Sequence, residues 1–254
     1  MSQLAFVTGA TSGIGRATAE ALAVKGYRLA LAARNQEALE TAAEELRMKY
    51  NAEVSVYVLD VRDREAIEKT AAACMARDGV PDVLVNDAGL ARGLEPYGET
   101  LPEDIEQMID TNIKGLFHVT RAFLPAMLKR NKGHIINLGS TAGLYAYAGA
   151  AVYCATKAAV KTFSDGIRID VIDSDIKVTT IQPGIVKTAF SEVRFHGDKK
   201  RADAVYEGVD ALHPEDIAEV ISFVLSQPKR VQISDVVIMA NQQATGFMVS
   251  KKKS

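Results

Sequence analysis

The stretch Leu4-Ala-Phe-Val-Thr-Gly-Ala-Thr-Ser-Gly-Ile-Gly15 joins a short apolar run to a turn that holds three glycines. The residues that follow predict a helix from about 14 to 25, which ends near Gly26. Glycines let the backbone turn tightly, and the free N–H groups of a helix N-terminus attract an anion such as a pyrophosphate. The turn therefore favours a dinucleotide site. Its spacing, Gly-x-x-x-Gly-x-Gly, differs from the common Gly-x-Gly-x-x-Gly, so a tight turn without a ligand is the alternative.

Six more short apolar runs follow the first one, and helical patterns fill the intervals between them. The seven runs are residues 4–8, 28–33, 53–59, 83–86, 134–138, 177–182 and 236–239. Runs that are apolar at nearly every position indicate strands buried on both faces, and their alternation with helices indicates right-handed crossovers. We therefore expect residues 1–254 to form one α/β domain, with a Rossmann-type doubly wound parallel sheet of about seven strands and helices on both faces.

The composition excludes several classes of protein. A net charge of -2 offers no attraction for nucleic acid, and the lysine run at 251–253 is expected to be a solvated tail. Two cysteines, Cys74 and Cys154, make neither a disulfide framework nor a metal pattern. The first residues lack the charged lead and cleavage site of a secretory signal, and no apolar run has the length of a membrane span. We expect a cytoplasmic protein without a metal, nucleic-acid or membrane partner.

The end of the second predicted strand bears on the choice of cofactor. A site that prefers NAD carries an acid there, which bonds the ribose hydroxyls. Here the position holds Arg34, followed by Asn35, and the first acid is Glu37. A guanidinium forms charge-assisted hydrogen bonds of roughly 1.5–3 kcal/mol each with a phosphate. The pair therefore favours NADP(H), and an exposed arginine at a strand end is the alternative.

A tyrosine and a lysine four residues apart, Tyr153 and Lys157, share one face of a predicted helix. Lowering the tyrosine pKa from near 10 to near neutral requires roughly 4 kcal/mol of preferential stabilisation of the phenolate, and Lys157 can supply much of it. Ser140 follows a predicted strand and could bond a substrate oxygen, while Asn112 is a candidate to hold a water beside the lysine. Each residue alone has a structural alternative, such as a helix cap, but the four in this order favour catalysis.

The chain resembles the short-chain dehydrogenase/reductase family over essentially its whole length. The resemblance lies in Thr8-Gly9-x-x-x-Gly13-x-Gly15, Asp60, Asn86-Asp87-Ala88-Gly89, Asn112, Ser140, Tyr153-x-x-x-Lys157 and Pro183-Gly184. It implies that Tyr153 is the acid/base, that Lys157 bonds the nicotinamide ribose and lowers the tyrosine pKa, and that Ser140 orients the substrate.

The same resemblance implies a cofactor site. Its residues are Gly9, Thr11, Ser12, Gly13, Ile14, Gly15, Arg34, Asn35, Asp60, Val61, Asn86, Asp87, Ala88, Gly89, Tyr153, Lys157, Pro183, Gly184, Val186 and Thr188. Two positions depart from the family pattern. Asp87 replaces the second asparagine of an Asn-Asn-Ala-Gly turn, which removes an amide donor and adds a negative charge near the cofactor. Ser12 stands where NADP-preferring members often have a basic residue.

More narrowly, the stretches 134–143, 147–149 and 190–198 resemble the NADP-dependent 3-hydroxy acid dehydrogenase branch. Its members oxidise serine, allo-threonine and similar acids, and relatives reduce short aldehydes such as malonic semialdehyde or sulfoacetaldehyde. The polar insertion at about 186–210 has the character of a lid or substrate loop. An anionic substrate needs a cation, for which Arg194 is the first candidate, Arg92 the second and Lys187 a third. The alternative is that all three are solvated.

Assembly is implied by the resemblance alone. Similar proteins pair helices across two-fold axes, so we expect a homotetramer or homodimer that uses the helices at 103–130 and 153–172, with residues 241–248 reaching a neighbouring subunit. Two other functions stay open. One is the reduction of a bulkier ketone, quinone or steroid, against which the polar insertion argues. The other is a non-catalytic NADP(H)-binding sensor, against which the complete catalytic set argues.

Overall fold

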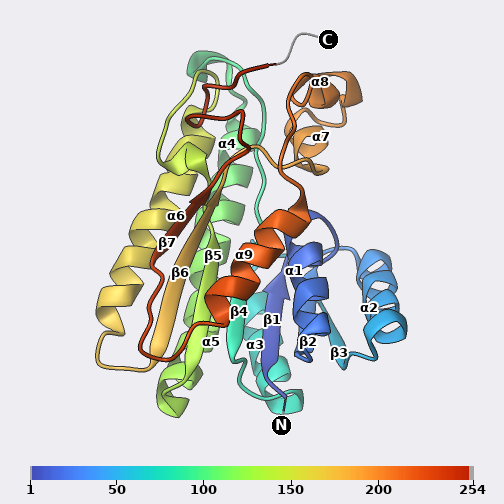
Figure 1. The fold of residues 1–254 in the computed structure, drawn as a ribbon, viewed down its shortest axis with the longest axis vertical. Coiled ribbons are helices and arrows are strands. Elements are labelled where there is room, and N and C mark those ends of the chain that lie inside the picture. The colour runs from blue at the N-terminus through green and yellow to red at the C-terminus, as the bar shows by residue number, and fades with distance from the viewer. Residues whose placement is uncertain (1, 252–254) are drawn as a thin grey trace.

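Seven parallel strands form one sheet in the order β3-β2-β1-β4-β5-β6-β7, which confirms the predicted doubly wound architecture (Figure 1). The computed structural model describes residues 2–251, so two lysines of the predicted tail lie outside the described residues. The strands are β1 (Leu4–Thr8), β2 (Arg28–Ala33), β3 (Val54–Val58), β4 (Val83–Asn86), β5 (Gly133–Leu138), β6 (Ile176–Pro183) and β7 (Asp235–Ile238). Each agrees with a predicted run to within a residue or two.

Helices cover both faces of the sheet (Figure 1). The helices are α1 (Gly13–Val24), α2 (Gln36–Tyr50), α3 (Arg64–Arg77), α4 (Pro102–Ile109), α5 (Leu116–Arg130), α6 (Ala151–Asp170), α7 (Phe190–Arg194), α8 (Lys199–Ala204) and α9 (Pro214–Leu225). Side chains of α1, α2 and α9 pack in one hydrophobic cluster with the sheet, and side chains of α3, α5 and α6 pack in a second. Among residues 2–251, no helix is long and apolar enough to cross a membrane.

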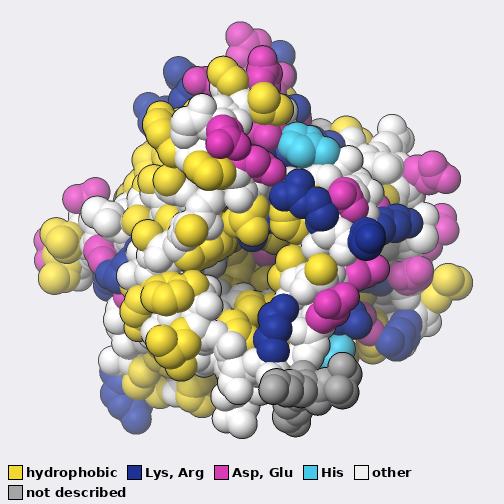
Figure 2. Space-filling model, turned by 90° about the horizontal axis from the view of Figure 1, so that it is seen from above, with side chains coloured by type: hydrophobic (Ala, Val, Ile, Leu, Met, Phe, Trp, Pro, Cys, Tyr) yellow, Lys and Arg dark blue, Asp and Glu magenta, His cyan; other side chains and the backbone are white. Residues whose placement is uncertain are grey.

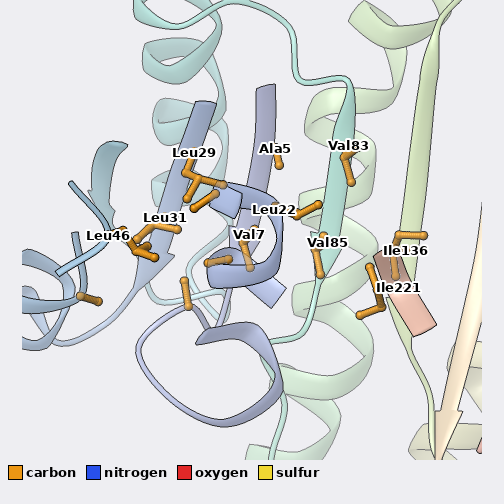
Figure 3. Close-up of a cluster of buried hydrophobic side chains, with 14 of the residues drawn as sticks. Ala5, Val7, Leu22, Leu29, Leu31, Leu46, Val83, Val85, Ile136 and Ile221 are labelled. Atoms are coloured by element: carbon orange, nitrogen blue, oxygen red, sulfur yellow. The ribbon is translucent and has the colours of Figure 1, made fainter. Parts of the chain in front are cut away.

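Alternation along the strands divides the core between the two faces. In β1, Ala5 and Val7 belong to the first cluster, whereas Leu4 and Phe6 belong to the second. Figure 3 shows the first cluster, in which side chains of neighbouring strands meet Leu22 of α1 and other helical residues. This two-sided burial is the reason that the strands are apolar at most positions.

The helix predicted over 103–130 is interrupted in the structure. Between α4 and α5 the chain makes a π-helical turn, Asp110–Gly115. A Cβ at Gly115 would lie 2.8 Å from the carbonyl oxygen of Val61, so the glycine lets this turn approach the loop after β3. The extra residue of the turn brings the buried Asn112 side chain against Leu90.

Parallel strands place all their carboxyl ends at one edge of the sheet. The glycine turn after β1, the segments after β2 and β4, and Ser140 after β5 all lie at this edge. The α7 and α8 helices form the insertion after β6 and lie at the same edge, at the top of Figure 1.

Candidate active site

A cavity of about 770 Å³ opens at the carboxyl edge of the sheet. Figure 2 looks onto this edge and shows a hollow framed by hydrophobic side chains, with lysine or arginine side chains beside it. The predicted site residues that line the cavity are Gly9, Thr11, Ser12, Gly13, Ile14, Arg34, Asn35, Asp60, Val61, Asp87, Ala88, Gly89, Ser140, Tyr153, Lys157, Pro183, Gly184, Val186, Thr188 and Arg194. Most of the predicted site residues thus lie in the wall. Gly15, Asn86 and Asn112 do not line it.

The glycine turn forms a cradle that side chains would fill. Gly9 and Gly13 have φ values of +69° and +54°, in the left-handed region that favours glycine. A Cβ at Gly15 would lie 2.5 Å from the Gly9 carbonyl oxygen. The first turn of α1 carries no acidic residue, and the Ser12 side chain does not cap it. The helix therefore presents free N–H groups and its positive dipole end, an arrangement that fits a pyrophosphate.

Arg34 and Asn35 lie at the far end of the cavity wall, after β2. The Asn35 side chain accepts a hydrogen bond from Ala38 N at 3.0 Å and so caps α2. Arg34 is exposed and makes no ion pair within the described residues. Nearby, Arg62 bonds Asp60 at 2.6 Å and holds the pKa of that carboxyl below its usual range, with Arg34 adding a smaller effect in the same direction. A free guanidinium at this position fits a phosphate.

Two expected site residues are directed elsewhere by their hydrogen bonds. Asn86 donates to Thr120 Oγ1 at 2.9 Å and to Asn137 Oδ1 at 2.8 Å, so its amide joins β4 to α5 and β5 inside the core. Asn112 exchanges hydrogen bonds with the backbone of Leu90 and donates to Thr156 Oγ1 at 3.0 Å. Both of its amide protons are therefore used, and this side chain positions the loop after β4 against α6 instead of lining the cavity.

Lys157 reaches the cavity from α6. Its Nζ donates to the Leu138 carbonyl oxygen at 2.8 Å, at the end of β5. Burial lowers the pKa of Lys157 to about 8, and the charge of Asp87 opposes that shift. A Cβ at Gly143 would lie 2.7 Å from the Lys157 carbonyl oxygen, so this glycine is what lets α6 pack closely enough.

Tyr153 is buried in the wall, at 7% exposure. Burial raises the pKa of its phenol and Tyr147 adds to the rise, while Arg194 and the Ser140 hydroxyl lower it. The guanidinium carbon of Arg194 lies 5.1 Å from the Tyr153 ring centre, whereas Lys157 Nζ lies 6.0 Å from it. The sequence predicted Lys157 as the stabilising cation; the structure brings a second cation closer to the ring. The raised pKa keeps the Tyr153 phenol protonated at neutral pH.

Of the three candidate substrate cations, Arg194 alone lines the cavity. Its NH2 donates to Tyr147 Oη at 3.1 Å, and its buried Nε has no hydrogen-bond partner within residues 2–251. Arg92 instead donates to Gln107 Oε1 at 3.1 Å and to the Val193 carbonyl oxygen at the end of α7. Lys187 is exposed and lies outside the wall. Contacts between segments that are distant in sequence decide this choice.

The sequence did not single out two polar residues of the wall. The Tyr206 hydroxyl lies 2.8 Å from Ser191 Oγ, so it ties the chain after α8 to α7. Gln243 Oε1 accepts a hydrogen bond from Ile185 N at 2.9 Å. The segment 241–248, expected to reach a neighbouring subunit, therefore contributes Gln243 to this chain's own cavity. Neither residue carries a motif, because each is placed by folding back over a long stretch of chain.

Comparison with known proteins agrees with this geometry. Residues 3–199 match the family model of the short chain dehydrogenases. The NADP-dependent 3-hydroxy acid dehydrogenase YdfG of Salmonella typhi is 46% identical over 250 residues, which cover 98% of this chain and 99% of that protein. The NADP-dependent 3-hydroxy acid dehydrogenase of Schizosaccharomyces pombe is 42% identical, covering 98% and 96%.

A solved structure of the closed form of serine dehydrogenase complexed with NADP+ superimposes with a TM-score of 0.91 at 42% identity. The match covers 99% of this chain and 100% of that one. The sequence resemblance is confirmed over the whole length, and so is the fold. The chain belongs to the short-chain dehydrogenase/reductase family.

Proposed function

We propose that the protein is an NADP(H)-dependent oxidoreductase that interconverts an alcohol and a carbonyl on small 3-hydroxy acids such as serine, or on short anionic aldehydes. One observation carries the choice of substrate class. Arg194, a cation without an acidic partner in the described residues, lines the same cavity as Tyr153 and contacts its ring. The relatives named for 3-hydroxy acids and serine support the same choice.

The residues present fit the cofactor. The N-terminal turn of α1 would hold the pyrophosphate, Arg34 and Asn35 the 2′-phosphate, and Asp60 with Val61 the adenine. The turn 87–89 would line the adenosine ribose, and residues 183–188 would lie along the nicotinamide. When bound, the nicotinamide supplies or accepts the hydride.

The chain's own residues manage one proton. In reduction, protonated Tyr153 donates its proton to the substrate carbonyl oxygen, and in oxidation the phenolate accepts the alcohol proton. The Ser140 hydroxyl accepts a hydrogen bond from Ala142 N at 3.1 Å and donates a long one, of 3.4 Å, to the Pro183 carbonyl oxygen. Turning this donor toward the substrate oxygen would let Ser140 orient the substrate. Arg194 stabilises the phenolate through its charge. Lys157, whose Nζ lies 6.0 Å from the ring centre, would add to this effect.

The insertion 186–210 serves as the substrate loop of a single catalytic domain. Two polar contacts support this role by fastening the insertion to the segment that precedes α5. His196 Nε2 lies 3.0 Å from Asp104 Oδ2, and Arg201 NH2 lies 3.1 Å from Glu95 Oε1. Since α7 carries Arg194, the position of this loop decides where a substrate anion would sit.

Assembly into a homotetramer or homodimer in the cytoplasm completes the proposal. Exposed apolar side chains after and within α6 support an interface there, since Ile169 is 70% and Ile172 76% exposed. Sedimentation of the purified protein gives its mass directly. A monomer at every concentration would exclude both assemblies.

The test is NADPH formation from NADP⁺ with a panel of serine, allo-threonine, 3-hydroxyisobutyrate, 3-hydroxypropionate and uncharged alcohols, with NAD⁺ in parallel. Turnover confined to the anionic 3-hydroxy acids and to NADP⁺ is the expected result. Turnover only with uncharged or bulky substrates would leave the catalytic residues and remove the anion site. Cofactor binding without turnover on an extended panel would favour the sensor.

A further inference from the structure

The carboxylate of Asp87 reaches the helix end that is suited to bind an anion. Asp87 follows β4, and its backbone N–H donates to Thr8 Oγ1 at 3.0 Å. Its side chain lies against the glycine turn: a Cβ added at Gly9 or Gly15 would be 2.8 or 2.6 Å from Asp87 Oδ2. The Gly15 N–H, in the first turn of α1, favours the ionised form of this carboxylate and so lowers its pKa. An acidic side chain from another segment therefore lies against a helix N-terminus that carries no acid of its own.

Few charges face this carboxylate. From α6, the Lys157 ammonium favours the ionised form, and from α1 the Gly15 N–H does the same. The turn after β1 and Asp87's own turn contribute backbone groups; a Cβ at Gly89 would lie 3.5 Å from Lys157 Nζ. Burial outweighs both favourable contacts and raises the pKa of Asp87 to about 7. The side chain therefore exchanges its proton near neutral pH.

We propose that Asp87 couples cofactor binding to the uptake of a proton, so that its neutral form admits the pyrophosphate at the N-terminus of α1 and its ionised form opposes it. The inference rests on the proposed cofactor site. An ionised carboxylate and a pyrophosphate at one helix end repel each other, and the cavity wall screens that repulsion less than water does. Protonation removes the repulsion and leaves a hydroxyl that can donate to an anionic or ribose oxygen.

The expected effect is a pH dependence of affinity. A group with a pKa of about 7 in the free protein that stays protonated in the complex weakens binding about tenfold between about pH 6 and pH 8. The experiment measures NADPH dissociation constants over this range by fluorescence, for the wild type and for Asp87→Asn. The wild type should lose about tenfold more affinity than the variant. The 2′-phosphate titrates alike in both proteins, so it cancels in the comparison.

Calorimetry supplies a second measurement that does not depend on the variant. Binding heats in buffers of different ionisation enthalpy give the number of protons taken up, which near pH 7.5 should be most of one proton for the wild type. The matched control is Asp165→Asn, which removes a carboxylate of α6 that lies outside the cavity. Although burial opposes them, hydrogen bonds from Lys161 and Arg168 keep the pKa of Asp165 low, so this control should retain the wild-type pH dependence.

The outcomes separate the two proposals. If the affinity for NADPH depends on pH in the same way in the wild type and in Asp87→Asn, the role of Asp87 is overturned. Wild-type binding without proton uptake overturns it as well. If the wild type does not bind NADPH at any pH, the cofactor site itself is refuted. An Asp87→Asn variant that does not fold leaves the wild-type proton count as the deciding measurement.

Discussion

The guanidinium carbon of Arg194 lies 5.1 Å from the centre of the Tyr153 ring, and its charge lowers the pKa of a phenol that burial raises. The cation proposed to bind the substrate anion thus also acts on the proposed acid/base. An anion that pairs with Arg194 would weaken this effect and favour the protonated phenol. In the proposed site, substrate binding and the proton balance would therefore be linked through one side chain.

Replacement of Arg194 tests the anion site. Arg194→Met should raise KM for 3-hydroxy acids by roughly 10- to 100-fold, because one or two charge-assisted hydrogen bonds are lost. KM for uncharged alcohols should change little. Lys187→Met is the matched control, since Lys187 is exposed outside the cavity. An equal rise in KM for charged and uncharged substrates would contradict the assignment.

Removal of the Tyr153 hydroxyl tests proton transfer. Tyr153→Phe keeps the buried ring and should lower kcat by about 10²- to 10⁴-fold, the usual range for general acid–base catalysis. NADPH affinity, measured by fluorescence, should stay within about twofold, because the lost group acts on the substrate oxygen. Loss of cofactor binding in a folded variant would contradict the role of Tyr153 as the acid/base.

Removal of the Arg34 side chain tests the choice between the two nicotinamide cofactors. Arg34→Ala should weaken the binding of NADPH by about tenfold or more and leave the binding of NADH unchanged, since only NADPH carries a 2′-phosphate for the guanidinium. Arg64→Ala is a suitable control, because Arg64 is an exposed arginine that pairs with Glu68 on α3. If the binding of both cofactors is weakened equally, Arg34 does not bind the 2′-phosphate.

A buried histidine predicts sensitivity to acid. His134 Nε2 lies 2.8 Å from Thr179 Oγ1, whose hydroxyl donates to the Ile233 carbonyl oxygen, and burial lowers the pKa of His134 to about 3. Below about pH 6.5 this histidine is protonated in the unfolded chain but stays neutral in the folded chain. The free energy of unfolding therefore has its full value above that pH and decreases as the pH falls toward 3.

The loss should approach about 1.4 kcal/mol per pH unit. Because the raised pKa of Asp87 acts in the opposite direction between about pH 4 and 7, the quantity to measure is a difference. Urea unfolding at several pH values compares the wild type with His134→Gln, which keeps a donor for Thr179 and cannot titrate. The free energy of unfolding of the variant should depend less on acid; identical profiles would disprove the prediction.

Local pattern was enough to predict the architecture, and most of the predicted site residues line the cavity. The apolar runs predicted all seven strands, and the glycine turn, Ser140 and the Tyr153/Lys157 pair lie in the cavity wall as expected. The prediction of a helix over 103–130 was wrong in one respect, because a π-helical turn interrupts it. Contacts with Val61 and Leu90, which no local pattern encodes, hold this turn. Asn86 likewise turns into the core because Thr120 and Asn137 accept its amide protons.

The sequence by itself determined the order of strands and helices, the glycine cradle and the four-residue spacing of acid/base and lysine, because each follows from the period of one segment. Tertiary structure alone decided which cation faces the cavity and how strongly Asp87, Tyr153 and Lys157 hold their protons. Proton affinity depends on burial and on nearby charges, and both arise where segments distant in the chain meet.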